Sequence, residues 1–411
     1  MKKYFFSAIN LLNFLSFLWI LAALIIYDFR LVKMAYYLFF ISYLIEFFTD
    51  KKWKNINFDK KRVYFLFMLA FFLLALINIP FDSTPVYTKI LMEKRYGLFG
   101  FAVVGFFGVN KYFKLSYIIN SFVIISVLTI FYLLFYRFGI NDFIAHSNRF
   151  EEFNLLRSKY VNTHMIFNFY LNISLIGIWY ILTRQWSIIK WWWRYLYVAA
   201  LTLIICTLSI SEGRSGFIIG IFLLAVFTFL EIWERRKTIG IIVALLIPFL
   251  LIGIASTHKR ISEKIIEGEP RWFLWQSGVD VIKQSPIWGH GISNAQELFD
   301  ISRAKFQTED YRLQWIKAKH LDSHNQLIQS TMEFGIVGIV LLIFLYLYPI
   351  FISDKNTFPF SVFVIGLCIY QSTFDMFITG QFCILFCILI IGIISARNDI
   401  GKNMKKKRKL I

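Results

Sequence analysis

Long apolar segments recur along the whole chain, and they constrain its fold more than any other feature. A helix that crosses a membrane needs about 20 mostly apolar residues. Windows of roughly this length predict about twelve transmembrane helices, at 5–27, 31–48, 63–80, 96–110, 115–137, 161–182, 195–211, 216–232, 239–256, 332–351, 359–377 and 381–396. The sequence therefore predicts an all-α fold, a polytopic membrane helix bundle.

The composition leaves little room for a separate soluble domain with its own core. Of the 411 residues, 58% are hydrophobic and 17% are charged, whereas a soluble domain has about 45–50% apolar and about 25% charged residues. About twelve spans of about 20 residues would use nearly all of the apolar residues. We therefore expect residues 1–411 to form a single integral membrane domain.

The net charge of +19 has two readings. In a soluble protein it would indicate nucleic acid as a partner, but in a membrane protein basic residues mark the cytoplasmic loops. With the N-terminus in the cytoplasm, nearly all of the excess basic residues fall on that side, from Lys2 and Lys3 to the basic segment 402–409. The apolar run after Lys3 is too long for a signal peptide. The distribution predicts a multi-pass protein with both termini cytoplasmic, surrounded by membrane lipids and without a nucleic-acid partner.

The longest connection, 257–331, is predicted on the opposite side of the membrane, between the ninth and tenth spans. A loop of this length is usually functional. Pro270 in the first turn predicts a helix that ends at the Pro- and Gly-containing turn 285–291. One apolar face of this helix is predicted from the spacing of Trp272, Trp275, Val279 and Ile282. The helix is expected along the membrane surface or over a cavity.

The loop ends in a polar segment, His320 to Gln326. Ionisable groups at a membrane boundary are costly to bury without a function. In a helix, His320 and His324 would share one face. His324 is suited to general-base catalysis because an ordinary histidine titrates near neutral pH, and the neighbouring His320, Asp322 and Asn325 are candidates for substrate binding. A solvated loop and a His/Asp/His metal site are the alternatives, although three ligands at ideal spacing are not evident.

Two further polar groups are predicted on the same side. Arg214 lies in the short connection between the seventh and eighth spans, near the edge of the hydrocarbon region, with Glu212 as its possible partner. The second group stands at the outer mouth of the fourth span and contains Lys89, Lys94 and Arg95. Asp375 is predicted near the outer end of the eleventh span. Snorkelling arginines and helix-end anchors are the plainer interpretations of these residues.

Together these groups predict a basic, histidine-containing site at the outer leaflet. Arginine side chains bind phosphate oxygens with two parallel hydrogen bonds, so a phosphate or diphosphate suits the site. A Walker loop and a Rossmann glycine fingerprint are absent from the sequence. A nucleotide is therefore not expected as the energy source, and an activated lipid diphosphate is the natural donor outside the cytoplasm. No cofactor is predicted. All four cysteines fall in predicted spans, so no disulfide or thiolate metal site is expected.

Several short motifs in 205–345 carry a family resemblance. They are Ser-Glu-Gly-Arg-Ser-Gly (211–216), Pro-Arg-Trp (270–272), Ser-Pro-Ile-Trp-Gly-His-Gly (285–291), Asp-Ser-His-Asn-Gln (322–326) and Glu-Phe-Gly-Ile-Val-Gly (333–338). In order, spacing and placement this pattern resembles the bacterial O-antigen ligase and O-antigen polymerase superfamily, the membrane glycosyltransferases of the WaaL/Wzy type.

The resemblance implies a GT-C-like bundle in the bacterial inner membrane, with a large helical periplasmic loop between spans nine and ten. It implies transfer of a glycan from undecaprenyl diphosphate, in the periplasm, by a metal-independent enzyme that inverts the anomeric centre. The family's functional arginines correspond to Arg214 and Arg271, and its catalytic histidine to His324. Ligases often carry a His-x-His arrangement, and the spacing from His320 to His324 departs from it.

The resulting expectation is an O-antigen ligase that attaches the glycan to lipid A–core in lipopolysaccharide biosynthesis. Two alternatives differ only in the acceptor: a polymerase that joins lipid-linked repeat units, and a protein O-oligosaccharyltransferase. A lipid or anion transporter or flippase is an alternative from a different class. The missing inverted repeat, and the gathering of polar residues in one outer loop, argue against that class.

Overall fold

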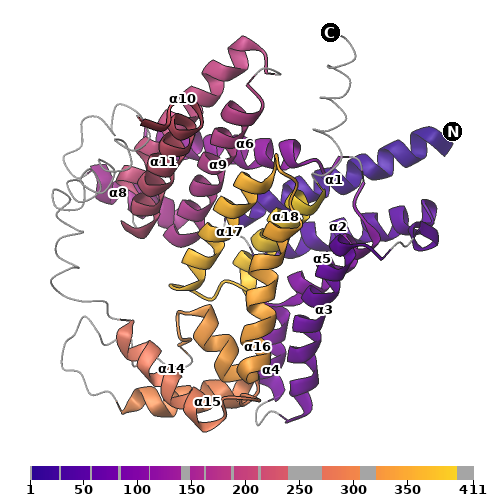
Figure 1. Ribbon diagram of the computed structural model, residues 1–411, viewed down its shortest axis with the longest axis vertical. Coiled ribbons are helices and arrows are strands. Elements are labelled where there is room, and N and C mark those ends of the chain that lie inside the picture. The colour runs from indigo at the N-terminus through magenta and orange to yellow at the C-terminus, as the bar shows by residue number, and fades with distance from the viewer. Residues whose placement is uncertain are drawn as a thin grey trace. The chain divides into compact units, whose positions relative to one another are not determined.

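The computed structural model describes residues 2–26, 29–55, 58–81, 85–110, 112–139, 149–161, 163–186, 189–211, 214–238, 271–305 and 321–395. Within these ranges every regular element is helical (Figure 1), which confirms the prediction of an all-α fold. The elements are α1 (Lys2–Ile26), α2 (Phe29–Thr49), η1 (Lys52–Asn55), α3 (Lys60–Asn78), η2 (Ile79–Phe81), α4 (Pro85–Glu93), α5 (Tyr96–Phe107), α6 (Leu115–Phe131), η3 (Tyr132–Phe138), α8 (Arg149–Tyr160), α9 (His164–Arg184), α10 (Trp191–Ile210), α11 (Arg214–Arg235), α14 (Trp272–Gln284), α15 (Ile292–Ala304), α16 (Gln326–Phe351), α17 (Phe358–Ser372) and α18 (Gly380–Ser395).

Among the described residues, 8 helices are long and apolar enough to cross a membrane, so the chain is a multi-pass membrane protein. They are Ser7–Ile26, Arg30–Thr49, Lys60–Asn78, Leu115–Arg137, His164–Arg184, Trp191–Ile210, Gly216–Glu234 and Gln326–Phe351. Two shorter apolar helices, Phe358–Ser372 and Gly380–Ile394, correspond to the last two predicted spans, and α5 corresponds to the fourth. The predicted span at 239–256 lies outside the described residues, so the total of about twelve stays a prediction.

The chain divides into two compact units. The first contains Met1–Ser42 and Lys114–Gly268, and the second contains Tyr43–Phe113 and Glu269–Ile411. Each unit combines two separate stretches of the sequence, so helix packing and not chain order defines it.

Helix α9 forms the core of the first unit. It is buried without a break from Ile166 to Ile181, as expected for a helix that is apolar on all sides, and it packs against α1, α6, α10 and α11. The Asn172 amide donates to the carbonyl oxygen of Gly216 at 3.1 Å, and the Ser211 hydroxyl donates to Asn168 at 2.9 Å. A Cβ atom at Gly216 would lie 2.6 Å from the Asn168 side chain. The two ends of the 211–216 motif are therefore held against this buried helix.

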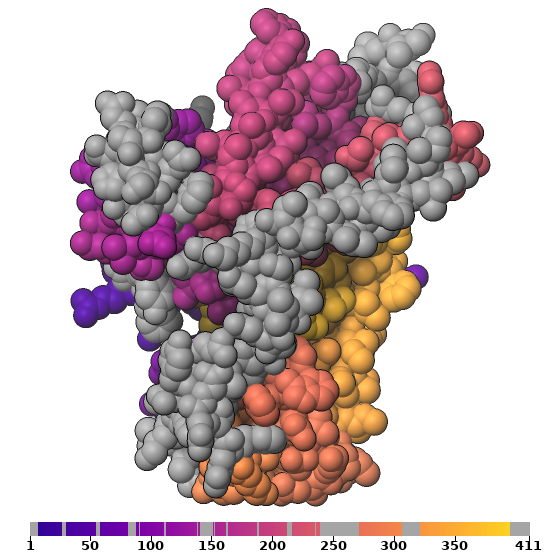
Figure 2. All heavy atoms as spheres, turned by 90° about the vertical axis from the view of Figure 1, so that its left-hand side faces the viewer, coloured from indigo at the N-terminus to yellow at the C-terminus, as the bar shows by residue number. Residues whose placement is uncertain are grey.

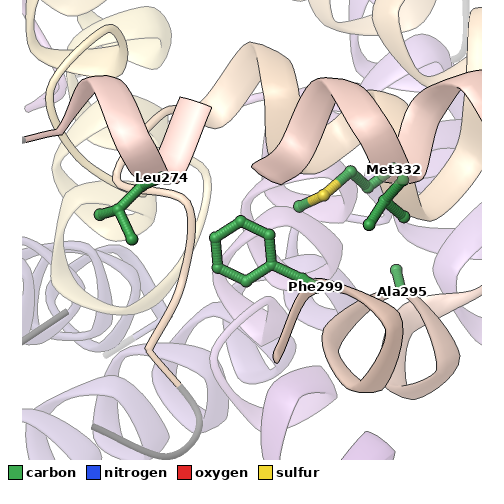
Figure 3. Close-up of a cluster of buried hydrophobic side chains, with 5 residues drawn as sticks. Leu274, Ala295, Phe299 and Met332 are labelled. Atoms are coloured by element: carbon green, nitrogen blue, oxygen red, sulfur yellow. The ribbon is translucent and has the colours of Figure 1, made fainter. Parts of the chain in front are cut away.

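The second unit packs α14 and α15 onto the first half of α16. Its core contains Leu274 and Val281 of α14, Ala295 and Phe299 of α15, and Met332 of α16 (Figure 3). Burial of each large apolar side chain contributes roughly 1.5–3 kcal/mol. In the space-filling view the salmon atoms of 271–305 lie against the orange and yellow atoms of 321–395 (Figure 2). Helices α14 and α15 are therefore a packed part of the unit.

The predicted helix exists with the expected bounds, but its buried face overlaps the predicted apolar face only in part: Trp275 and Ile282 are partly buried against the core. Trp272 is 63% exposed and Val279 is 42% exposed, while Leu274, Gly278 and Val281 are buried. A Cβ atom at Gly278 would lie 2.3 Å from the Ile328 side chain. The missing side chain at Gly278 lets α14 approach α16 closely, and this close approach selects the buried face.

Candidate functional site

Helix α16 is broken near its middle. Gly335 has φ 59° and ψ −149°, which interrupts the helical conformation. The backbone groups at the break bond to the turn that follows α14: the N–H groups of His290 and Gly291 donate to the carbonyl oxygens of Met332 and Glu333, both at 2.9 Å. In the other direction, the Ile336 N–H donates to the Pro286 carbonyl at 3.0 Å. The 285–291 and 333–338 motifs thus complete each other's hydrogen bonding.

This junction requires glycine on both sides. A Cβ atom at Gly335 would lie 2.2 Å from the Ile287 carbonyl oxygen, and one at Gly289 would lie 2.5 Å from the Glu333 carbonyl oxygen. Both residues have positive φ values, 59° and 70°, which a residue with a Cβ atom rarely adopts. The two glycines allow the turn and the broken helix to lie in backbone contact.

Replacement of Gly335 by alanine is expected to lower the free energy of unfolding. The strained backbone alone would cost about 1–3 kcal/mol. The clash with the Ile287 carbonyl oxygen adds to this cost. Gly366→Ala in α17 is the matched control, because a Cβ atom there would meet nothing within 4 Å. Thermal unfolding in detergent measures both variants. Equal melting temperatures would contradict the assigned role of the junction.

His324 lies in a turn directly before α16. Residues 321–325 are not helical, and His324 has φ 47°, an uncommon value for a residue other than glycine. The Asp322 carboxylate accepts a hydrogen bond from the His324 N–H at 2.9 Å. The Asn325 side chain caps α16 by accepting from the N–H groups of Leu327 and Ile328. The predicted helical face shared by His320 and His324 is therefore wrong for His324, because the Asp322 and Asn325 side chains start the helix after it. His320 itself lies outside the described residues.

Two carboxylates face the same ring nitrogen of His324. Its Nδ1 atom lies 3.3 Å from an Asp322 oxygen and 3.9 Å from an Asp375 oxygen. Asp375 belongs to the connection between α17 and α18, which is tied to the start of α16: the Asn325 amide donates to the Thr373 carbonyl at 3.4 Å, and the Ile378 N–H donates to Gln326 at 2.8 Å. The structure thus brings together four predicted site residues, Asp322, His324, Asn325 and Asp375, of which Asn325 also caps the adjoining helix.

Basic residues border this group. Lys94 is close enough to lower the pKa of Asp322 electrostatically. The Arg271 guanidinium carbon lies 5.8 Å from the centre of the Phe374 ring, and Phe374 directly precedes Asp375. Lys89, on α4, is exposed. We call the residues Asp322, His324, Asp375 and Arg271 the histidine cluster.

Burial raises the pKa of Asp322, and the Asp375 carboxylate raises it further. His324 and Lys94 act in the opposite direction without cancelling the effect. The folded state thus holds the Asp322 proton more tightly than the unfolded state does. Protonated Asp322 therefore stabilises the folded state. This contribution is present below the unfolded pKa of about 3.9 and is lost as the pH rises through the folded-state pKa of Asp322.

Asp322→Asn is therefore expected to raise the melting temperature near neutral pH, with a gain that shrinks on acidification. The asparagine keeps an oxygen that can accept from the His324 N–H, so the turn is preserved. Thermal unfolding in detergent is compared in acid and at about pH 8. A gain in melting temperature that is larger in acid than at the higher pH would contradict the raised pKa of Asp322.

Arg95 is buried, so it does not line an open basic mouth at the end of the fourth span. It is 1% exposed, and its Nη2 atom lies 2.5 Å from an oxygen of the equally buried Glu333. The second Glu333 oxygen accepts from the Gln329 amide at 2.9 Å, and Gln329 accepts from the Ser323 N–H at 3.5 Å. Within the described part of the chain, Arg95 Nε and Nη1 have no hydrogen-bond partner. A polar path therefore joins Arg95 to the residue before His324.

Sequence analysis did not select Gln329 or Phe374. Gln326, Gln329 and Glu333 form one polar face at the start of an otherwise apolar helix, and this spacing was a signal for Gln329. Phe374 had no such signal, because one phenylalanine among 47 is not distinctive.

The remaining predicted site residues are less fully described. Arg214 begins α11 in the first unit, and its side chain is not described. Glu212 lies outside the described residues. In the part of the chain that the structure covers, no group of three or more His, Cys, Asp or Glu side chains could hold a metal ion.

The comparison with known proteins covers the segment that carries these motifs. Residues 198–343 match the family described as O-antigen ligase. The resemblance to the O-antigen ligase superfamily is thus confirmed over this part of the chain. The matched segment contains Arg214, Arg271 and His324, whereas Arg95 and Asp375 lie outside it.

Curated relatives agree with this match. A provisionally named polysaccharide ligase of Rickettsia typhi is 31% identical over 184 residues, which cover 41% of this chain and 43% of the relative. A provisionally named polysaccharide ligase of Rickettsia prowazekii is 32% identical over 167 residues, covering 38% and 39%. An uncharacterised protein of Haemophilus influenzae is 25% identical over 186 residues, covering 38% and 43%. The chain thus spans less than half the length of these relatives.

Proposed function

We propose that this protein is a membrane glycosyltransferase that moves a glycan from undecaprenyl diphosphate to an acceptor hydroxyl on the periplasmic face of the inner membrane. The family match supports a ligase-type function. The observation that carries the chemistry is the pair of carboxylates at His324 Nδ1, with an arginine beside the same connection. Cytoplasmic termini and a periplasmic site are part of this proposal.

The carboxylates 3.3 and 3.9 Å from Nδ1 support a general-base role for His324. A carboxylate that accepts from Nδ1–H fixes the imidazole tautomer and leaves the lone pair on Nε2. Nε2 then takes the proton of the acceptor hydroxyl as its oxygen attacks the anomeric carbon. The anomeric carbon–oxygen bond to the diphosphate breaks in the same step, and the diphosphate leaves with the electron pair. Direct displacement of this kind inverts the anomeric centre.

Arginine side chains stabilise the leaving diphosphate in this scheme. Arg271 is the candidate beside the histidine cluster, and the unpaired Nε and Nη1 atoms of buried Arg95 are donors of the kind that a phosphate oxygen would accept from. Lys89 and Lys94 add positive charge for substrate binding. Arg214, with Glu212 as its orienting partner, is proposed from its motif alone, and so is His320.

The acceptor proposed first is lipid A–core, which makes the protein an O-antigen ligase. A polymerase that extends a lipid-linked repeat, or transfer to a protein hydroxyl, would use the same donor and the same histidine. The names of the relatives favour the ligase among these.

One experiment tests the function and the acceptor. The purified protein in detergent is given a polyprenyl-diphosphate-linked glycan with either lipid A–core or a second lipid-linked repeat as acceptor. Product on lipid A–core supports the ligase, and extended lipid-linked product supports the polymerase instead. A lipid or anion transporter needs a sealed bilayer and would give no product, which would overturn the proposal. A gene knockout gives a cellular check, since loss of a ligase leaves unattached polymer on the lipid carrier.

A further inference from the structure

A groove opens in the first unit between α6, α9 and α10, with a volume of about 610 Å³. Most of its wall is aliphatic and comes from one face of α6 together with parts of α9 and α10: Val123, Ile124, Val127, Leu128, Ile181, Leu196 and Ala200. Ile124 and Leu196 are 54% and 51% exposed, so the groove is continuous with the apolar surface of two membrane-spanning helices.

Polar groups gather at one end of this groove. Lys190 and Gln185 line it where α9 ends and α10 begins, and Trp193 lies one turn further along α10. The Tyr197 hydroxyl donates to the Asn120 side chain at 2.8 Å, near the beginning of α6. The groove therefore has an aliphatic body and a polar mouth, and both belong to the same unit.

The mouth is positively charged. Lys190 is exposed, and among the described residues that line the groove there is no Asp or Glu. Two nearby arginines have other partners: Arg184 pairs with Glu234 at 2.7 Å, and Arg194 donates to the Trp186 carbonyl at 2.7 Å. Lys190 is thus the basic side chain placed at the entrance. The distribution of charge in the sequence predicts that this end faces the cytoplasm.

We propose that this groove binds an anionic phospholipid. One acyl chain lies along the aliphatic wall, and Lys190 and the Gln185 amide bind the phosphate. Basic pockets between transmembrane helices on the cytoplasmic side suit anionic headgroups, and tryptophan side chains such as Trp193 favour the headgroup level. A zwitterionic lipid would fill the same apolar wall without the charge attraction. This site does not depend on the proposed glycan transfer.

Native mass spectrometry of the whole protein in detergent tests the site. Wild-type protein is titrated with phosphatidylglycerol and, separately, with phosphatidylcholine of the same acyl chains. We expect phosphatidylglycerol to bind more tightly, and Lys190→Ala to weaken its binding by about five-fold, the effect of one basic residue near an anionic lipid. Lys237→Ala is the control: Lys237 is also exposed and does not line the groove.

A second variant tests the aliphatic wall. Ala200→Leu places additional side-chain volume in the groove and should reduce binding of both lipids by a similar factor, at an unchanged elution volume of the protein. Equal binding of the two headgroups by wild type would overturn the proposal, as would equal effects of Lys190→Ala and Lys237→Ala. Displacement of phosphatidylglycerol by a lower concentration of polyprenyl phosphate would also overturn it, since the groove would then hold the donor carrier.

Discussion

Replacement of His324 by alanine is expected to lower glycan transfer by about 10²–10⁴-fold, the usual contribution of a general base. The side chain is the proposed proton acceptor, and Asp322 and Asp375 both approach its Nδ1 atom. Transfer to lipid A–core by equal amounts of purified wild-type and variant protein measures the loss. Activity within a few-fold of wild type would remove His324 from the mechanism.

Two variants show whether the loss is specific. Asp375→Asn keeps the size of the side chain and removes a carboxylate that faces Nδ1, so it should lower transfer by less than His324→Ala does. His164→Ala changes a histidine at the start of α9, in the other unit, and should leave transfer near the wild-type rate. If His164→Ala caused an equal loss, the His324 effect would not indicate a role in proton transfer.

Glu333→Leu is expected to destabilise the protein by about 3–5 kcal/mol, because it leaves the Arg95 guanidinium buried without its counter-charge. The pair is almost completely inaccessible, with side-chain exposures of 2% for Arg95 and 1% for Glu333. Thermal unfolding in detergent measures the effect. Glu234→Leu is the matched control: its partner Arg184 is 32% exposed and Glu234 is 54% exposed, so the expected loss is about 0–1 kcal/mol.

The double variant Arg95→Met with Glu333→Leu separates structure from function. Removal of both charges should restore much of the stability lost in Glu333→Leu, since apolar side chains of similar volume often replace a buried pair well. A stable double variant that fails to transfer glycan would assign a phosphate-binding role to Arg95. A stable and fully active one would show that the pair only holds the broken helix. If the double variant were as unstable as Glu333→Leu, the loss of stability would not come from an unpaired buried charge on Arg95.

Local sequence patterns predict much of the fold and several residues of the candidate site. Hydropathy located the long apolar helices, and the Pro and Gly residues around 270–291 predicted both ends of α14. The candidate residues His324, Asp322 and Asp375 were chosen because polar groups at a membrane boundary are costly. The helical continuation from His320 to His324 is wrong for His324, because the Asp322 and Asn325 side chains accept from backbone N–H groups and α16 begins only at Gln326.

The sequence by itself determined that the chain is a helical membrane protein and which residue types are available for chemistry, because apolar length and helix-end signals are local properties. Only the tertiary structure decided which groups meet. It placed Asp375 beside His324, fitted 286–291 into the break of α16, and buried Arg95 against Glu333, a residue 238 positions away. Such pairings depend on close helix packing at a few glycines and on the cost of burying a charge without its partner. Neither condition can be read from one segment alone.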